Sequence, residues 1–235
     1  SGMFDITGLS SGTVYVKEIT APDNYLKDST VHEMSVTDGQ TANLKLTDEQ
    51  QKGEFHLYKS GEGLMLAQPT AMTEHAEGEK TTGKQAEDGT GIYHEFQYTN
   101  GKRVAGVEFE LYAKDTIYAP DGSGDVLYEK DQLVTTLTTD KTGYAEAKDL
   151  PLGTYYLKEV KAGTNYVLNT EQKEITIAQN PNAAENPATI ETVDYTNDRQ
   201  KVKVSLEKED AVTKESLEGV IFGLYTAEDI SSDDG

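Results

Sequence analysis

Three polar side chains fall at strand positions where the sequence pattern calls for a core residue. Lys59, Glu159 and Asn197 each follow apolar residues at positions i−2 and i−4. Because side chains alternate between the two faces of a strand, all three are predicted to lie on an apolar face. Burial favours the neutral amine of a lysine and the protonated acid of a glutamate. A neutral amine beside a carboxamide, with an acid to move protons, can form a lysine–asparagine amide bond and release ammonia.

Each residue alone has a plainer explanation, namely a polar residue at a strand end that reaches solvent, because lysine and glutamate are rarely buried. The glutamate, however, recurs. The stretch LPLGTYYLKEVKAGTNYVL at 150–168 nearly repeats LSSGTVYVKEITAPDNYL at 9–26, and Glu18 matches Glu159. A buried, unpaired carboxylate costs several kcal/mol. A core-side glutamate that recurs in a repeat therefore predicts a role.

The repeat runs through the whole chain. LTDEQQK, which contains Asp48, matches YTNDRQK, which contains Asn197. Further on, KVKVSLEKED follows the pattern around Lys59 and gives Lys208 as its equivalent. We predict three units. They are the C-terminal half of a first domain at 1–49, a complete domain at 50–199, and the N-terminal half of a third domain at 200–235.

Short alternating segments separated by Gly, Pro and Asn turns fill the chain, which predicts an all-β fold made of β-sandwich units. Residues 4–6, 31–36 and 42–46 are among the expected strands of the first unit. Residues 61–91 are polar and rich in Gly, Thr and Glu, and we expect them to be irregular. We interpret 61–100 as an insertion into the complete domain.

The composition limits the possible functions. Asp and Glu total 42 against 21 Lys and Arg, so the net charge is −21, which argues against nucleic acid and anionic membranes as partners. The chain has no cysteine, which excludes disulfides and thiolate metal sites. No apolar run approaches membrane-spanning length and no signal peptide is visible. The opening Ser1-Gly2 resembles a tag remnant, so we expect the chain to be a piece of a longer protein.

A strand-borne lysine, the GTYYLKE and GTVYVKEITAPDNY stretches, and a terminal Y-T-N together resemble the Cna B-type and SpaA-type domains of Gram-positive surface proteins and pilins. The resemblance covers essentially the whole chain and implies a prealbumin-like, Ig-like β-sandwich. In that family a lysine and an asparagine or aspartate form an autocatalytic isopeptide bond with help from a glutamate. The resemblance makes Lys59 the nucleophile, Asn197 the acceptor and Glu159 the proton shuttle. The complete copy departs from the family in one turn, KAGTNY, after the glutamate.

The resemblance also implies a structural stalk or pilin-like module of an extracellular, cell-wall-anchored protein. Neighbouring repeats would be its partners, it would need no cofactor, and it would crosslink itself once rather than act as an enzyme. The two partial units lead to a further hypothesis. If the halves of two molecules pair head to tail, Lys208 comes near Glu18 and Asp48 and can form an intermolecular bond.

An adhesin is the main alternative, in which the 61–100 insertion binds a host matrix protein or glycan, because long loops often carry function. Asp121, Ser123 and Asp125 are spaced loosely like a calcium loop, but no bidentate glutamate follows at the right distance, so we favour a surface turn and expect no metal site. The four histidines are scattered, and no G-x-S-x-G motif or phosphate loop is present. These absences disfavour a hydrolase.

Overall fold

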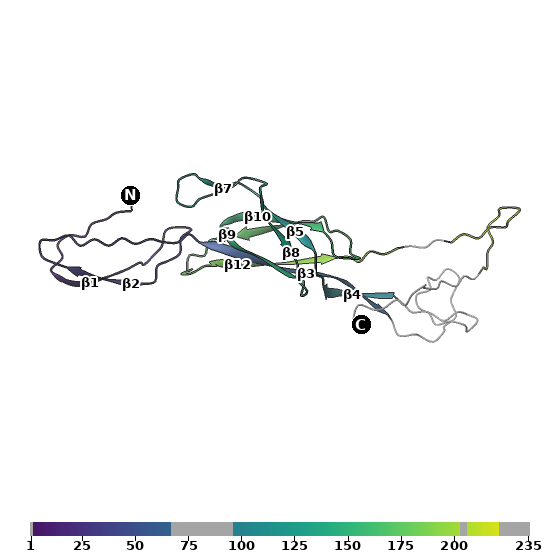
Figure 1. Cartoon of the computed structure of the whole chain (residues 1–235), viewed down its shortest axis with the longest axis horizontal. Coiled ribbons are helices and arrows are strands. Elements are labelled where there is room, and N and C mark those ends of the chain that lie inside the picture. The colour runs from purple at the N-terminus through teal and green to yellow at the C-terminus, as the bar shows by residue number, and fades with distance from the viewer. Residues whose placement is uncertain (1, 67–95, 203–205, 221–235) are drawn as a thin grey trace.

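A computed structural model of the chain describes residues 2–66, 96–202 and 206–220. The described part is built of strands, and it contains no helix that could span a bilayer. The molecule is elongated, with a small N-terminal unit at one end and a β-sandwich in the middle (Figure 1). The strands are β1 (Gly12–Lys17), β2 (Val31–Val36), β3 (Lys52–Leu66), β4 (Phe96–Arg103), β5 (Glu108–Ala113), β6 (Ile117–Tyr118), β7 (Val126–Tyr128), β8 (Leu133–Thr138), β9 (Tyr144–Pro151), β10 (Gly153–Lys161), β11 (Gln172–Ile177) and β12 (Thr189–Asn197).

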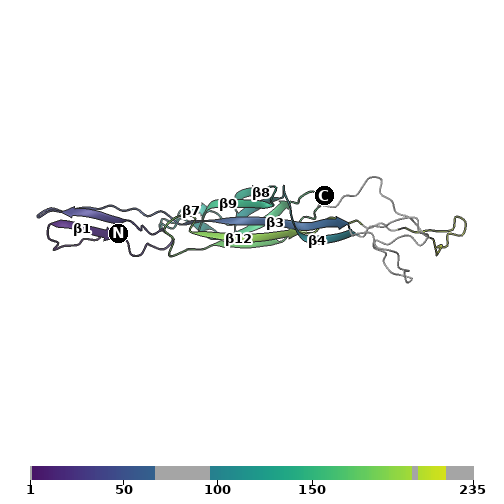
Figure 2. The ribbon, with the colours of Figure 1, turned by 90° about the horizontal axis from the view of Figure 1, so that it is seen from below.

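Two sheets form the central sandwich. One has the order β11-β10-β5-β8, and the other has the order β12-β3-β4, with β9 also paired to β3. All of these pairs are antiparallel except β12 with β3, which run parallel. Figure 2 shows β3 and β12 lying side by side along the length of the molecule. The first and last strands of the domain are therefore direct neighbours.

The core of the sandwich comes from the inward positions of both sheets, as the alternation predicted. β5 shows this most simply, since its burial alternates at every residue. The largest fully buried apolar side chains of the core are Phe55, Leu57, Phe109, Leu111, Tyr155, Leu157, Ile177 and Tyr195. The expected all-β sandwich is confirmed.

The strand β3 is longer than the sequence indicated. It continues through Gly61 to Leu66, where irregular structure was expected, and pairs with β4 in a register that runs from Ser60↔Arg103 to Leu66↔Phe96. Polar, glycine-rich sequence disfavours a strand, but the partner strand supplies the backbone hydrogen bonds that hold it extended. The expected insertion thus starts as a two-stranded ribbon, and its residues 67–95 lie outside the described part of the chain.

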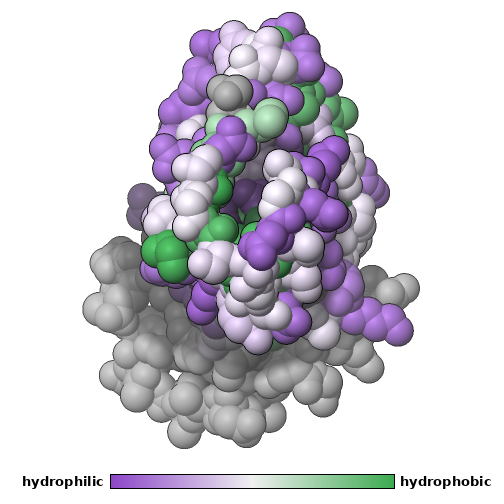
Figure 3. Space-filling model, turned by 90° about the vertical axis from the view of Figure 1, so that its left-hand side faces the viewer, coloured by the Kyte–Doolittle hydropathy of each residue, from purple (hydrophilic) through white to green (hydrophobic). Residues whose placement is uncertain are grey.

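The N-terminal unit holds a single hairpin-like pair, in which β1 and β2 are antiparallel with Gly12 opposite Val36. The strands expected at 4–6 and 42–46 did not form, because neither segment pairs with another among the described residues. A strand needs a paired neighbour to satisfy its backbone groups. Figure 3 looks onto this end of the molecule and shows apolar side chains at the surface among hydrophilic ones. The exposed apolar residues of the unit include Met3, Phe4, Ile6, Leu9, Tyr15, Ile19, Val31, Leu44 and Leu46.

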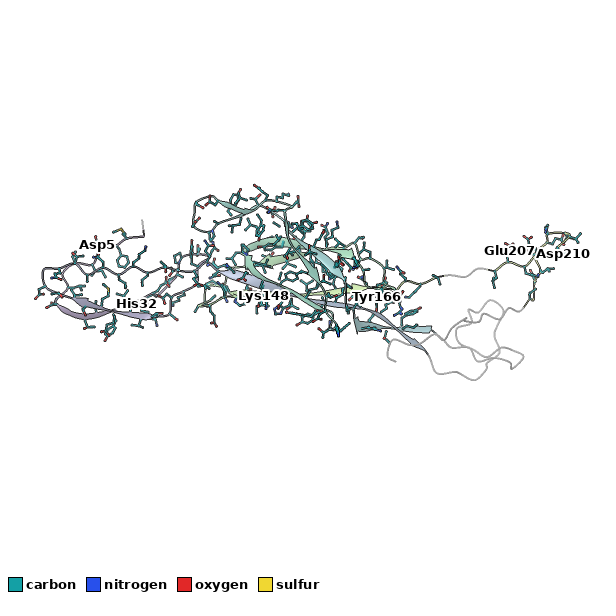
Figure 4. The ribbon with its side chains drawn as sticks, viewed as in Figure 1. Asp5, His32, Lys148, Tyr166, Glu207 and Asp210 are labelled. Atoms are coloured by element: carbon teal, nitrogen blue, oxygen red, sulfur yellow. The ribbon has the colours of Figure 1, made fainter. Side chains whose placement is uncertain are left out.

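The chain leaves the sandwich at the opposite end from the N-terminal unit. Figure 4 places His32 at one extreme and Glu207 and Asp210 at the other, with Lys148 and Tyr166 in the sandwich between them. In the described residues 206–220 the one β pairing is an isolated bridge between Glu209 and Ser216, which encloses a turn. The division into two partial domains and one complete domain stays a prediction.

Candidate functional site

Lys59 lies at the centre of β3 and points into the sandwich. Its side chain is 0% exposed. The backbone of this residue sits where the neighbour of β3 changes from β9 to β4, since its N–H donates to Gly143 O at 2.7 Å and its C=O accepts from Val104 N–H at 3.2 Å. The ammonium nitrogen donates to the carbonyl oxygens of Ser60, at 2.9 Å, and Tyr195, at 3.2 Å.

Glu159 reaches the same place from β10, in the opposite sheet, and is 1% exposed. Its Oε2 lies 3.9 Å from Lys59 Nζ. Its Oε1 accepts a hydrogen bond from Asn197 Nδ2 at 2.5 Å and a longer one from the backbone N–H of Asn169 at 3.5 Å. The carboxyl group therefore stands between the amine and the carboxamide and touches both.

Asn197 is the last residue of β12 and is 2% exposed. In the parallel register Asn197 lies opposite Gly61, two residues beyond Lys59 on the same face of the sheet. Two buried oxygens of the site have no hydrogen-bond partner, Oδ1 of Asn197 and Oε2 of Glu159. Buried polar atoms are nearly always paired, so an unpaired amide oxygen and carboxyl oxygen at one site mark it as unusual.

Aromatic rings separate the three groups from solvent. The Tyr195 ring has Lys59 Nζ at 5.5 Å from its centroid, and Phe109 packs edge-on against it at 5.1 Å. The Tyr195 hydroxyl donates to the backbone carbonyl of Glu171. A second lysine, Lys173, lies 5.3 Å from the same ring. The groups are therefore held in a medium of low polarity, where charge is costly.

The low-polarity medium shifts both ionisable groups towards their neutral forms. Burial lowers the pKa of Lys59 to about 8, an effect that the nearby Glu159 carboxylate opposes and the charge of Lys173 reinforces. Burial also raises the pKa of Glu159 above its usual value, against the hydrogen bond from Asn197 and the charge of Lys59. The amine thus becomes a better nucleophile near neutral pH, and the carboxyl group a better proton donor.

Gly61 and Tyr166 close the end of the site. A Cβ at position 61 would stand 2.3 Å from the Tyr166 ring, so the ring rests on the bare backbone of β3 beside Asn197. The Tyr166 hydroxyl donates to Glu62 O at 2.9 Å. Only a glycine at position 61 leaves room for this contact.

The residues of the partial copies lie elsewhere. Glu18 and Asp48 belong to the N-terminal unit and are half-buried, and Glu18 Oε2 accepts from the backbone N–H of Asp28 at 2.6 Å. Lys208 is exposed in the segment at the opposite end of the molecule. The structure therefore brings together Lys59, Glu159 and Asn197, and it leaves Lys208 remote from the other two within one chain.

The acidic loop at 121–125 forms local turns. Asp121 Oδ1 accepts from the Ser123 N–H at 2.9 Å, and Ser123 Oγ accepts from the Asp125 N–H at 3.1 Å. Within the described residues, no group of three or more His, Cys, Asp or Glu side chains could hold a metal ion.

Three residues that complete the site, Asn169, Tyr166 and Gly61, were not predicted as site residues from the sequence. One signal was present in the sequence. The tyrosine follows the glutamate by seven residues in both copies, as Tyr25 follows Glu18. The residue before each tyrosine is an asparagine with positive φ, 69° at Asn24 and 67° at Asn165. Asparagine tolerates this conformation better than most residues, so the N-Y pair marks a fixed turn.

Comparison with known proteins gives the family. The model of the SpaA family, described as a prealbumin-like fold domain, matches residues 1–50 and 89–192. The trypsin-resistant surface T6 protein of Streptococcus pyogenes serotype M6 is 37% identical over 70 residues, which are 30% of this chain and 13% of that protein. The chain therefore spans a small part of this relative's length.

Solved structures with similar architecture include the Bacillus anthracis TIE protein, with 25% identity, a TM-score of 0.47, and coverage of 81% of this chain and 26% of that one. Another is the group B streptococcus pilus 2b backbone protein, with 16% identity, a TM-score of 0.36, and coverage of 72% and 48%. The family match covers most of the chain, and the resemblance inferred from the sequence is confirmed: the chain belongs to the SpaA family of prealbumin-like fold domains.

Proposed function

We propose that the chain is a structural module of a Gram-positive cell-surface protein, and that an isopeptide bond between Lys59 and Asn197 stabilises it. The observation that carries the proposal is the packing of an amine, a carboxyl group and a carboxamide from β3, β10 and β12 in one solvent-free site. In this proposal Glu159 shuttles protons.

The reaction balances with the groups that are present. Neutral Lys59 Nζ attacks Cγ of Asn197, and protonated Glu159 donates to the amide oxygen as negative charge develops there. An asparagine amide can turn by half a rotation and exchange its nitrogen and oxygen, which would let Oδ1 accept from the Glu159 carboxyl group. The carboxylate then takes a proton from the attacking nitrogen and delivers it to the leaving nitrogen. It recovers its own proton from the oxygen as ammonia leaves and the carbonyl re-forms. The products are the amide bond and one ammonia, so the chain reacts once and is not a turnover enzyme.

The position of the bond suits a load-bearing module. The chain enters the domain at the start of β3 and leaves it at the end of β12, and these strands are parallel neighbours. Tension applied along the chain would pass from residue 59 directly to residue 197 and bypass the residues between them. The bond also closes a loop of about 140 residues, which by the loop-entropy relation is worth about 5 kcal/mol of stability.

The family and the sequence composition support an extracellular setting. SpaA-family membership and the T6 surface protein as a relative both fit a pilin-like or stalk protein anchored to the cell wall. The chain has no cysteine, so an internal amide bond would take the role that disulfides have in other exported proteins. Neighbouring repeats of the same protein would be its principal partners.

The mass of the intact chain tests the bond. We expect the purified protein to be lighter than its sequence by the mass of one ammonia, and a tryptic digest to contain a branched peptide that joins Lys59 to Asn197. Glu159→Ala should restore the full mass because it removes the proton shuttle. The matched control is Glu18→Ala, which should keep the deficit. A full-mass wild-type chain would refute the proposal.

We also propose that the N-terminal unit of one molecule pairs with the C-terminal segment of another. Apolar side chains are exposed both in the N-terminal unit and in the opposite segment, where they include Val202, Leu206, Val212 and Leu217. Because these ends lie far apart in one molecule, pairing would join two molecules head to tail and bring Lys208 of one to Glu18 and Asp48 of the other (Figure 4). A ladder of covalent oligomers on a denaturing gel, lost in Lys208→Ala, is the expected result. Monomer alone in solution and on the gel would refute this pairing.

An adhesive role for the insertion has one observation in its favour. The ribbon of β3 and β4 extends beyond the sandwich, so the two ends of the insertion, at Leu66 and Phe96, are carried away from the core (Figure 1). Replacing 67–95 by a short glycine linker should then abolish binding to host matrix proteins or glycans and leave the mass deficit intact. Equal binding with and without the insertion would exclude this role.

A further inference from the structure

A buried glutamine holds the N-terminal unit to the sandwich. Gln51 is the last residue before β3, and its side chain is buried. Its Nε2 donates to Tyr25 O, in the N-terminal unit, at 2.8 Å, and to Asn180 O, in the sandwich, at 3.0 Å. Its Oε1 accepts from the Asn180 N–H at 3.0 Å. One side-chain amide therefore bridges the two units with three hydrogen bonds.

The loop between β11 and β12, residues 180–188, is also hydrogen-bonded to the backbone of the linker, residues 50–52, which joins the N-terminal unit to β3. Asn186 Oδ1 accepts from the Lys52 N–H at 2.8 Å, and Asn186 Nδ2 donates to Gln50 O at 3.1 Å. The loop also returns to β3, where Ala188 N–H donates to Lys52 O at 2.7 Å. The linker has little freedom to swivel, because its backbone is bonded on both sides of Gln51.

Apolar contact completes the joint. Leu26 of the N-terminal unit is 7% exposed and clusters with Ala183 and Ala188 of the loop. The N–H of Lys27 donates to Ala183 O at 3.0 Å. Leu26 is the one buried residue among the described residues 2–49, so this small cluster and the hydrogen bonds of Gln51 set the orientation of the N-terminal unit.

The same local arrangement recurs at the far end of the sandwich, around Gln200. Gln51 N–H donates to Asn24 O at 2.8 Å, and Gln200 N–H donates to Asn165 O at 2.8 Å. Gln200 Nε2 donates to Tyr166 O at 3.2 Å, as Gln51 Nε2 does to Tyr25 O. The isolated bridges also correspond, Tyr25 with Gln50 and Tyr166 with Arg199.

The two arrangements differ in what covers them. At the first joint Leu26 and Gln51 are buried by the loop at 180–188. At the far end the equivalent of Leu26 is Val167, which is 48% exposed, and both Leu168 and Gln200 are exposed as well. The second surface therefore presents the same backbone hydrogen bonds, the same glutamine amide and exposed apolar side chains, and no loop within the described residues covers it as 180–188 covers the first.

We propose that Gln51 locks adjacent units of this protein in one orientation, and that Val167, Leu168 and Gln200 form the matching surface for the next unit. The partner is a further unit of the same family, whose loop has the chemistry of residues 180–188. In such a loop the backbone N–H and C=O of an asparagine would bond the glutamine amide, as those of Asn180 do. Small alanines would pack against Val167 and Leu168, and an asparagine side chain would bond the backbone next to Gln200. The joint does not depend on the isopeptide bond.

Distance measurements between two spin labels test the joint, and the absence of native cysteines makes labelling clean. Cysteines would replace Tyr15, exposed on β1, and Thr192, exposed on β12. We expect one narrow distance distribution in the full chain. Gln51→Ala should broaden it severalfold and speed hydrogen exchange of the Asn180 amide. Gln200→Ala, the matched control, should leave the distribution narrow.

A broader distribution in Gln51→Ala could also arise from damage to the N-terminal unit itself. Asn186→Ala separates the two causes, because it loosens the linker from the sandwich side and leaves the N-terminal unit unchanged. It should broaden the distribution too. A broad distribution in the unsubstituted chain, or a narrow one in both Gln51→Ala and Asn186→Ala, would overturn the locked joint.

The second surface is tested in a duplicated chain, residues 1–201 followed by 53–235, in which Lys201 takes the place of Lys52. Labels at Thr192 of each copy should give a narrow distribution that Gln200→Ala broadens. If the label distances of the duplicated chain are broad without that substitution, the surface around Gln200 does not dock a following unit.

Discussion

The N-terminal unit and the sandwich contain the same local motif in two different surroundings. In each, the glutamate accepts a hydrogen bond from the backbone N–H ten residues later, Asp28 to Glu18 and Asn169 to Glu159. Yet Glu18 is half-buried, whereas Glu159 is 1% exposed and has a raised pKa. The motif folds from local sequence alike in both copies. The difference lies in β3 and β5, which cover Glu159 with core side chains and supply the lysine.

The local conformation of the motif and the burial of its glutamate have different causes. A glutamate placed by the turn alone remains partly exposed, as Glu18 does, and becomes fully buried where β3 and β5 cover it, as they cover Glu159. The buried, low-polarity environment is thus a property of the assembled sandwich, and under the proposed crosslinking a copy of the motif reacts only when it is covered. Substitutions at matched positions of the two copies should therefore have very unequal effects.

Mechanical extension should give the largest difference. When the wild-type chain is pulled from its two ends, the residues between Lys59 and Asn197 should not extend, because the bond bypasses them. Asn197→Ala should release about 140 residues, which adds roughly 480 Å of contour length. Asp48→Ala, at the matched position of the N-terminal unit, should leave the wild-type extension unchanged. Single-molecule force spectroscopy measures both, and a wild-type chain that extends like Asn197→Ala would contradict the crosslink.

The next effect is on thermodynamic stability. Lys59→Met keeps an apolar stem of similar length but removes the nucleophile, so the free energy of unfolding of the sandwich should fall by about 5 kcal/mol. Guanidinium unfolding followed by circular dichroism measures it. Lys208→Met, the matched change on an exposed lysine, should shift the same quantity by less than about 0.5 kcal/mol. Comparable losses in the two variants would mean that the buried lysine does not crosslink.

The rate of bond formation should depend on pH because the amine and the acid titrate as a pair. The reactive state holds one proton, on Glu159, with Lys59 neutral. Acid adds a second proton as the pH falls below the raised pKa of Glu159, and alkali removes the last one as the pH rises through about 8. The rate should therefore pass through a maximum and fall about tenfold for each pH unit above 8.

Unreacted chain for this measurement comes from brief cell-free synthesis into guanidinium chloride, followed by dilution into buffers of different pH and intact-mass sampling. Glu18→Gln should leave the profile unchanged. If the wild-type rate instead rises through pH 8 and then stays level, the amine alone controls the reaction and Glu159 is not the proton donor.

The sequence predicted the inward face of the strands well because strand alternation has a fixed period. Lys59, Glu159 and Asn197 could be assigned to the inward face from their neighbours alone. Strand formation itself was less predictable. Residues 42–46 alternate but stay unpaired, and the glycine-rich stretch after Gly61 is a strand, because in both places pairing overrides local propensity.

The joint could not be predicted, because its contacts are distant in sequence. Gln51 looks like one of several surface glutamines until the fold brings Asn180, 129 residues away, against its side chain. The repeat did carry a hint, since Gln51 and Gln200 occupy the same place in LTDEQQK and YTNDRQK. The proposed role of this glutamine follows only from the comparison of Gln51, which the loop at 180–188 covers, with Gln200, which is exposed.

The smallest expected effect concerns the ring that closes the site. Tyr166 is buried against Gly61, whereas its counterpart Tyr25 is half-buried in the N-terminal unit. Gly61→Ala would place a methyl group 2.3 Å from the Tyr166 ring and should displace it. We expect a loss of about 2 kcal/mol, measured by guanidinium unfolding in the Glu159→Ala background, where no crosslink masks the change.

Gly63→Ala is the matched control, because a Cβ at that position has its nearest contact, Thr99 Oγ1, at an ordinary 3.4 Å. Both glycines lie on β3 and face the same side, so differences in backbone entropy cancel between them. Displacement of the ring also admits water to the amine and the acid, so Gly61→Ala should slow bond formation in the otherwise wild-type chain while Gly63→Ala does not. If the two variants have equal stability and equal rates, the Tyr166 ring does not seal the site, and β3 and β5 alone exclude the water.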